Sequence, residues 1–275
     1  MVSSELNLLL LSAVILLLAV ASWQDIQSRE VTDWIWFGIA GMGIIVHGLS
    51  IFELALVGLS PLPYSLTVII NIITGILIAL LLGILGLGGE ADRISFIAIS
   101  TISPVTDPFF GHIDARYELL LDILPRILNT FCNSYLAAVP VPLVIFGYNL
   151  IKNRSNPRLY SLADESYKTR FIVRFIGYPR DTSGLKNDLM AKPWHYDLLE
   201  DYSETQKWHV DFRFQLDSPE GDLARKRKTI ELIESTGKQV VWIQPSLPFI
   251  LFISLGFLLD LVFGNVVFLG ISLLI

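Results

Sequence analysis

The chain has few charged residues and almost no cysteine. Of its 275 residues, 17% are charged and 53% are hydrophobic, whereas an average soluble domain carries about 25% charged residues. The net charge of −6 argues against a nucleic-acid-binding protein, which needs a concentrated basic surface. Cys132 is the one cysteine, so an internal disulfide and a zinc site built on cysteine pairs are both excluded. The composition, with a mean hydropathy of +0.58, predicts a membrane protein.

Lysine and arginine are nearly absent outside one segment. Sixteen of the 20 lie between Lys152 and Lys238. We therefore expect a membrane domain at residues 1–151, a polar α+β domain at 152–245 and a last membrane helix at 246–275. The predicted fold class is an all-α membrane bundle of about six transmembrane helices, with a small α+β cytoplasmic domain inserted before the last helix.

Six apolar stretches approach the roughly 20 residues that a spanning helix needs. They are Leu8–Ser22, Trp34–Phe52, Ser65–Leu87, Ile94–Pro104, Arg126–Leu150 and Leu247–Ile275. The fourth is short, and we expect Pro140 and Pro142 to kink the fifth. The first stretch could instead be a cleaved signal peptide, but Met1–Asn7 lack the Lys or Arg that usually precedes one.

The distribution of Lys and Arg predicts the orientation in the membrane. Positive charge is enriched in cytoplasmic loops, which places the polar insert in the cytoplasm. The loops Trp23–Asp33 and Gly86–Arg93 fall on the same side and hold one arginine each. The N-terminus and the loop Glu53–Tyr64 fall outside and hold none. We expect a multi-pass protein of the cell membrane.

The polar insert shows patterns of both strands and a helix. Residues Trp208–Leu216 alternate apolar and polar side chains, which predicts a strand. Ser218 and Pro219 suit the start of a helix, and Gly237 suits its end. Gln239–Ile243 and Phe171–Ile176 are predicted as two further strands.

Two aspartates follow alternate spans. Asp25 comes after the first span and Asp92 after the third, so the chain crosses the membrane twice between them and both lie at the same membrane face. Neighbouring carboxylates share one proton, so one can take a proton from water while the other donates to a carbonyl oxygen. Gly88 and Gly89 before Asp92 allow a close backbone approach. The pattern predicts an aspartyl peptidase that needs no metal and no cofactor.

Two segments carry a family resemblance. Asp25–Trp34 and the element Gly89-Glu90-Ala91-Asp92 resemble archaeal preflagellin peptidases, a branch of the type IV prepilin peptidases among membrane aspartyl proteases with a Gly-x-Gly-Asp motif. The resemblance implies that Asp25 and Asp92 are the catalytic pair, with Gly89 as the motif glycine. Ala91 replaces the second motif glycine, and Thr32 stands where many relatives have proline. The paired-cysteine element of many bacterial relatives is absent, so we expect no N-methyltransferase activity.

The resemblance also implies a substrate. It would be a preflagellin or prepilin-like precursor with a short basic leader ahead of a hydrophobic helix, cleaved at the cytoplasmic membrane boundary. Glu30, Asp33 and Glu90 could attract the basic leader, although exposed loop acids are common without such a role. Asp260, between Leu259 and Leu261, could have a functional role, for example as a polar contact between helices, or it could instead lie near a helix end or stay protonated.

Two other classes of protein fit part of the pattern. A transporter or channel could use Asp25 and Asp92 to hold a cation. A membrane scaffold would depend on the insert rather than on either aspartate. Replacing each aspartate by asparagine separates these classes, because a peptidase loses cleavage, a transporter loses ion movement and a scaffold loses neither.

Overall fold

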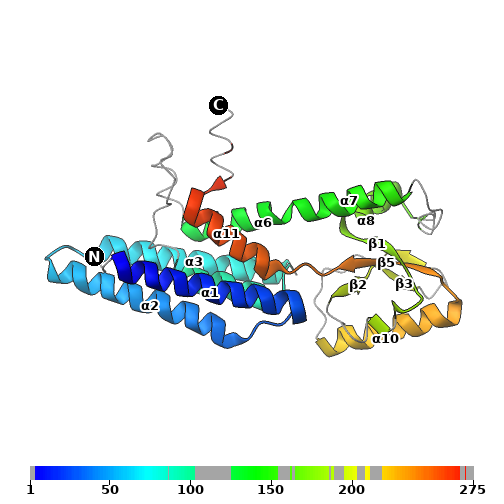
Figure 1. The fold of residues 1–275 in the computed structure, drawn as a ribbon, viewed down its shortest axis with the longest axis horizontal. Coiled ribbons are helices and arrows are strands. Elements are labelled where there is room, and N and C mark those ends of the chain that lie inside the picture. Colours follow the sequence, from blue (N-terminus) through cyan, green and yellow to red (C-terminus); the bar gives the residue numbers. More distant parts are fainter. Residues whose placement is uncertain are drawn as a thin grey trace. The chain divides into compact units, whose positions relative to one another are not determined.

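The computed structural model describes residues 4–85, 87–102, 125–153, 165–185, 195–202, 208–210 and 219–266, with residues 162, 187, 188 and 270. The chain forms two compact units (Figure 1). The first comprises Met1–Ala138 and Pro248–Ile275, and the second comprises Val139–Leu247. The domain boundaries drawn from the sequence at 151 and 245 stay a prediction.

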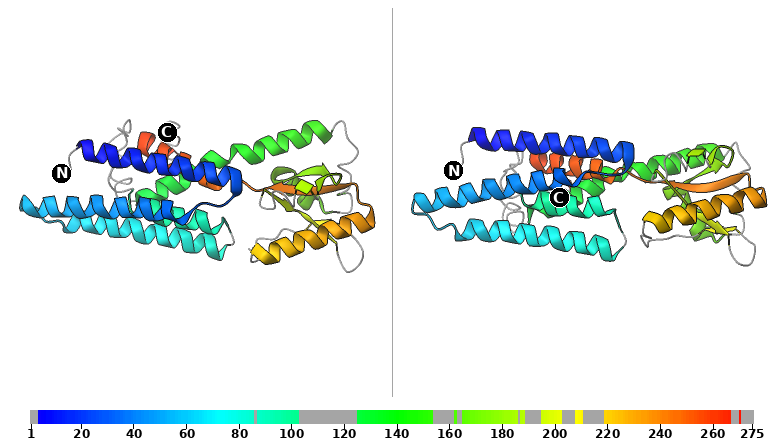
Figure 2. Two further views of the ribbon diagram at one scale, coloured as in Figure 1. Left: turned by 60° about the horizontal axis from the view of Figure 1, so that its bottom comes forward. Right: turned by 90° about the horizontal axis from the view of Figure 1, so that it is seen from below.

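Long apolar helices dominate the first unit. They are α1 (Ser4–Ser28), α2 (Asp33–Leu56) and α3 (Leu62–Ile84), which run side by side in Figures 1 and 2. Each is long and apolar enough to cross a membrane, as is the stretch Arg126–Lys152, which gives four candidate spans among the described residues. Large side chains on α3, such as Leu77 and Leu80, are more than half exposed, which suits contact with lipid.

Three shorter helices complete this unit: α4 (Glu90–Ser100), α6 (Arg126–Ala138) and α11 (Phe249–Phe263). The predicted fourth span begins four residues after the start of α4, and its last two residues lie outside the described part of the chain. In the predicted last span, the residues after 266, except 270, also lie outside the described part of the chain. The helix is interrupted after Ala138 and resumes at Pro140, where the prolines predicted a kink.

The core of the first unit is a single apolar cluster. It takes side chains from α1, α2, α4 and α11, including Leu18, Ile35, Ile39, Phe96, Ile99, Ile253 and Phe257. Small residues let helices approach closely, because a methyl group at Gly75 would overlap Ser100 and one at Gly256 would overlap Ser134. Asn71 of α3 links the end of α4 to the start of α6. Its side chain donates a hydrogen bond to the carbonyl oxygen of Ser100 and accepts one from the N–H of Ile127.

Asp260 lies inside this unit, where it is 3% exposed. Thr130 Oγ1 donates to Asp260 Oδ2 at 3.3 Å, which links α6 to α11. Asn133 Nδ2 donates a hydrogen bond of 2.8 Å to the carbonyl oxygen of Gly264, which also joins α6 to the end of α11. The bond to Thr130 makes Asp260 a polar contact between two helices, which is the role that the sequence suggested as an example.

The second unit is a small α+β fold. Its sheet has the order β1-β5-β2, with β1 (Tyr178–Asp181) and β2 (Tyr196–Leu198) both antiparallel to β5 (Val240–Pro245). A separate antiparallel pair is formed by β3 (Glu200–Tyr202) and β4 (Trp208–Val210). The strand predicted at Gln239–Ile243 is confirmed as β5, and the one predicted at Trp208–Leu216 is confirmed up to Val210, beyond which it lies outside the described residues.

Helices pack on both faces of β5. They are α8 (Tyr167–Ile176) and α10 (Pro219–Thr236), and α7 (Pro140–Asn153) packs in turn on α8. Alternate side chains of β5 point to opposite faces: Val241 and Ile243 join the side of Ile230 and Ile233 of α10, and Trp242 joins the side of Val173 of α8. The helix predicted from Pro219 to Gly237 is confirmed, with Gly237 at φ 65°; Ser218 lies outside the described residues.

The strand predicted at Phe171–Ile176 is wrong, because these residues form the greater part of α8. Ser166 caps this helix by accepting a hydrogen bond from the N–H of Thr169. The rings of Phe171 and Phe175, one turn apart, lie 5.1 Å from each other, and Phe175 stacks on Phe146 of α7. A short apolar run fits a strand or a helix equally well, and packing on α7 decides for the helix.

Candidate active site

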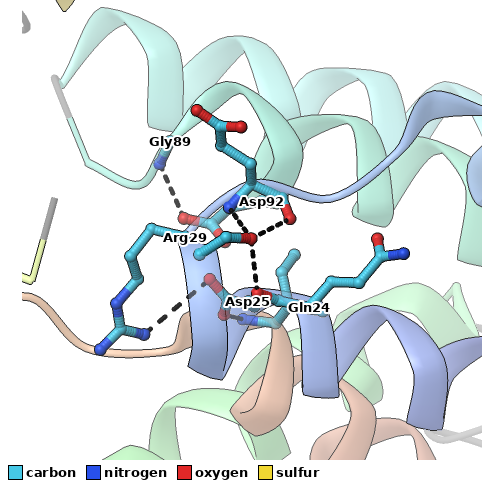
Figure 3. A network of polar contacts seen from close by, with 8 residues as sticks. Gln24, Asp25, Arg29, Gly89 and Asp92 are labelled. Atoms are coloured by element: carbon cyan, nitrogen blue, oxygen red, sulfur yellow. Dashed lines mark hydrogen bonds and ion pairs between the residues drawn. The ribbon is translucent and has the colours of Figure 1, made fainter. Parts of the chain in front are cut away.

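Asp25 lies in the last turn of α1, not in the loop where the sequence placed it (Figure 3). The helix continues six residues beyond the predicted end of the first span, and Asp25 is 7% exposed. Its Oδ2 accepts a hydrogen bond of 3.0 Å from the backbone N–H of Ile250, in the first turn of α11. Because helix N-termini carry unpaired N–H groups, the start of α11 is suited to hold a carboxylate in place.

The turn after α1 is built around Arg29. Arg29 is the one non-glycine residue with positive φ, 60°, among the residues that the structure describes. Its Nη1 lies 3.9 Å from Asp25 Oδ1, one helical turn away. Gln24 Oε1 accepts from both the N–H and the Oγ1 of Thr32, at 3.0 Å each. A proline in place of Thr32 would lack that N–H.

Asp92 lies in the first turn of α4, again in a helix and not in the predicted loop. Its Oδ2 accepts a hydrogen bond of 2.7 Å from the N–H of Gly89, the N-cap residue. Gly88 has φ 75°, and a Cβ added there would lie 3.1 Å from Asp92 Oδ2. Gly88 therefore adopts the left-handed conformation and brings the backbone close to the carboxyl group, whereas Gly89 has φ −74° and contributes its N–H; a role of either glycine in the reaction stays a prediction.

Burial governs the protonation of Asp92, which lies outside the four candidate spans. Burial raises the pKa of Asp92 to about 7. The Gly89 N–H lowers this pKa, the negative charge of Asp25 raises it, and the charges of Arg29 and Arg93 lower it. Asp92 is therefore partly protonated near neutral pH, and its charge interacts with that of Asp25 through space.

The two acids meet although they lie far apart in the sequence. Asp25 comes from the end of α1 and Asp92 from the start of α4, and Figure 3 shows the two side chains in one polar network with Arg29 and Gly89. The helices α2 and α3 carry the chain away and back between them, which agrees with an even number of membrane crossings. A buried pair of this kind can hold one proton and one negative charge, which suits activation of a water molecule.

The three acidic residues considered for leader binding differ in whether they line a hollow near the site. Glu30, Asp33 and Glu90 are all exposed. Glu30 lines a hollow of about 340 Å³ together with Gln24, Ser28, Val31 and Thr32, next to the turn that holds Arg29. Leader binding by these acids stays a prediction, and Glu30 is the one of the three that lines this hollow.

Sequence reasoning missed Arg29 and Ile250 at this site. Ile250 contributes a backbone N–H, so no side-chain pattern could identify it. The only available signal was its position two residues after Pro248, at the expected start of a helix. Arg29 had a signal, since it stands four residues after Asp25 and is the only basic residue before Arg93.

Two family models match the chain. The type IV leader peptidase family matches residues 12–143, and the archaeal peptidase A24 C-terminus of type II matches residues 169–266. The first match contains both Asp25 and Asp92, and the second contains most of the described insert and all of α11. The chain belongs to the type IV leader peptidase family. It is accordingly an aspartic-type peptidase with membrane helices, as the resemblance implied.

Relatives of this leader peptidase bear the name preflagellin peptidase. The protein of Methanococcus voltae is 23% identical over 253 residues, which cover 90% of this chain and 92% of the relative. That of Methanocaldococcus jannaschii is 22% identical over 254 residues, covering 90% and 91%. That of Methanococcus maripaludis is 29% identical over 166 residues, covering 58% and 63%.

Proposed function

We propose that this leader peptidase removes the short basic leader from preflagellins (archaellins) or type IV prepilin-like precursors. The feature that best supports this is the pair Asp25 and Asp92, brought into one polar network by α1 and α4. The names of the relatives, which span nearly the whole chain, support the same class of substrate.

In the proposed reaction the two carboxyl groups share the work of acid and base. The ionised member takes a proton from water, and the water oxygen attacks the scissile carbonyl carbon. The protonated member donates its proton to the carbonyl oxygen. When the tetrahedral intermediate collapses, a proton passes to the leaving nitrogen and the C–N bond breaks. Because the pair titrates as a unit, the two roles are assigned to the pair rather than to single residues.

The proposed topology follows the charge distribution. About six helices cross the membrane, the N-terminus is external, and the active site and the insert face the cytoplasm. Cleavage then occurs at the cytoplasmic boundary, so the hydrophobic helix of the precursor stays in the bilayer. Glu30 and Asp33 follow Asp25 in the sequence, and Glu90 precedes Asp92. Their negative charges attract the positive charges of the leader.

Cleavage of a precursor in isolated membranes tests this function. Membranes containing the wild type, Asp25→Asn or Asp92→Asn are incubated with a candidate preflagellin, and the mass of the product is measured. The wild type should remove the leader at one bond, and both variants should lose cleavage by at least a thousandfold while inserting normally. Cleavage by either variant at the wild-type rate rules the function out. Loss of ion flux with unchanged cleavage would instead indicate a transporter.

Replacing Glu30, Asp33 and Glu90 together tests the leader site. The neutral triple variant should cleave a basic leader more slowly and a neutral leader at an unchanged rate. Equal cleavage of the basic leader by both proteins removes this part of the proposal.

A further inference from the structure

An apolar groove of about 300 Å³ runs between α1 and α11. One face of each helix lines it, including Ala19, Ser22, Trp23 and Ile26 of α1 and Ser254 and Leu255 of α11. On each helix the lining positions recur at i, i+3, i+4 and i+7, so the groove follows the two helix axes. Its walls are open to the surroundings, since Trp23 is 61% and Leu255 is 40% exposed.

The polar groups in the floor of the groove are already paired with each other. Ser22 Oγ lies 2.9 Å from Ser254 Oγ and 2.8 Å from the carbonyl oxygen of Leu18. Ser254 Oγ also lies 3.4 Å from that carbonyl oxygen. With these groups satisfied, the groove offers an apolar surface, and small side chains at Ala19, Ser22 and Ser254 make it deep enough to accept part of another helix.

The groove ends at the candidate active site. Ile26, at its end, is the neighbour of Asp25 in the chain, and Leu251 is the neighbour of Ile250, whose N–H binds Asp25. At 1.5 Å per residue, Ala19 lies about 9 Å along the axis of α1 from Asp25. An apolar segment lying in the groove would therefore have its end near Asp25.

We propose that this groove binds the hydrophobic helix of the precursor, directly after the bond that is cut. The proposal rests on the proposed function and names the part of the enzyme that holds the substrate in the membrane. A lipid chain can cover any exposed side of α1, and a groove that ends near Asp25 offers it no advantage. A precursor helix in the groove, by contrast, has its scissile bond near Asp25, because that bond immediately precedes its apolar segment.

Filling the groove tests the proposal. Ala19 is exposed in the groove, so Ala19→Phe adds a ring there without entering the core. Val20→Phe is the matched control, because Val20 is 43% exposed on the same turn but does not line the groove. Ala19→Phe should lower kcat/KM for the full precursor at least tenfold, and Val20→Phe should leave it within twofold of the wild type.

A soluble peptide that carries the leader and the scissile bond but lacks the hydrophobic helix separates binding from chemistry. Ala19→Phe should cleave this peptide at the wild-type rate. Wild-type cleavage of the full precursor by Ala19→Phe overturns the groove and leaves the proposed function standing. An equal loss on both substrates also overturns it, because the substitution then acts on the carboxyl pair. A wild type that cleaves neither substrate overturns the function itself.

Disulfide trapping identifies the occupant directly. Leu255→Cys is placed in a Cys132→Ser, Asp92→Asn background, and the precursor carries a single cysteine early in its hydrophobic helix. The control is Leu80→Cys on α3, which is 57% exposed and lies outside the groove. A disulfide to the precursor should form at position 255 and not at 80. Trapping of two peptidase chains, or no trapping of the precursor, assigns the groove to a second copy or to lipid and overturns the proposal.

Discussion

The backbone N–H of Ile250 donates a hydrogen bond to Asp25 Oδ2 at 3.0 Å, joining two residues 225 positions apart. The bond fixes the carboxyl group of α1 against the first turn of α11. Only three residues separate the end of β5 from the start of α11, so the chain that leaves the second unit continues directly into the helical turn that binds Asp25.

Ile250→Pro should lower the cleavage rate more than Ile250→Ala does. Both changes shorten the buried side chain, but only proline removes the N–H that binds Asp25. A hydrogen bond to a charged group contributes about 1.5–3 kcal/mol, so we expect roughly a tenfold or greater difference between the two variants. Rates measured with the same precursor at equal amounts of inserted protein check this. Equal rates for the two variants would show that the N–H does not position Asp25.

Gly88→Ala should lower the cleavage rate by about tenfold, because an αL conformation costs a non-glycine residue about 1–2 kcal/mol and the new Cβ crowds Asp92. Gly58→Ala is a close control. Gly58 has φ 74°, like Gly88, but nothing lies within 4 Å of an added Cβ. Both variants should lose similar thermal stability, measured in detergent, and only Gly88→Ala should lose activity. A similar loss of activity in both variants would point to a general folding defect.

Cleavage should slow as the pH rises above about 7. Burial raises the pKa of Asp92 to about 7, and above that pH the pair of Asp25 and Asp92 loses the shared proton that the acid step needs. The rate should then fall about tenfold per pH unit. The positive charge of Arg93 lowers this pKa, so Arg93→Gln should move the falling limb to higher pH. A shift to lower pH, or a flat profile between pH 5 and about 9, contradicts the assignment.

Glu200 should be the most sensitive ionisable group in the insert. It is 3% exposed and accepts from Lys238 Nζ and from the N–H of Trp242, at 2.8 Å each. Burial raises the pKa of Glu200, although Lys238 opposes this, and burial likewise lowers the pKa of Lys238. Glu200→Ala leaves both donors unpaired and should cost about 3–5 kcal/mol in the free energy of unfolding of the second unit.

Proteolysis of the full chain during urea unfolding, with cuts mapped to residues 139–247, measures that cost. Asp188→Ala is the control, because Asp188 pairs with Arg180 on the surface and should contribute less than about 1 kcal/mol. A Glu200→Ala protein as resistant as the control would mean that the buried pair contributes little to folding.

Counting apolar stretches could predict that Asp25 and Asp92 lie at the same end of the membrane helices, but it could not predict how close the two carboxyl groups come. The length of a membrane helix is set by the bilayer, so the number of crossings between two residues does not depend on how the helices pack. The same reasoning could not place either residue in a helix. Polar residues from Ser22 to Ser28 resemble a loop, yet α1 continues through them because Ser22 and Asp25 bond to α11.

Other features depended on packing and gave no signal in the sequence. The run Phe171–Ile176 became a helix because Phe175 stacks on Phe146, which is far away in the chain. The groove along α1 exists because small residues there face Ser254, more than 230 positions later in the chain. In each case the decisive partner comes from a distant segment, and a local pattern contains no information about it.

The central claim is that Asp25 and Asp92 lie together at one face of the membrane, and cysteine labelling tests it most directly. Asp25→Cys and Asp92→Cys are introduced singly and together in a Cys132→Ser background, and intact cells and inverted vesicles are treated with a membrane-impermeant thiol reagent. Both cysteines should react only from the cytoplasmic side, and a short bifunctional reagent should link them within one chain. Labelling of the two positions from opposite sides would contradict the account.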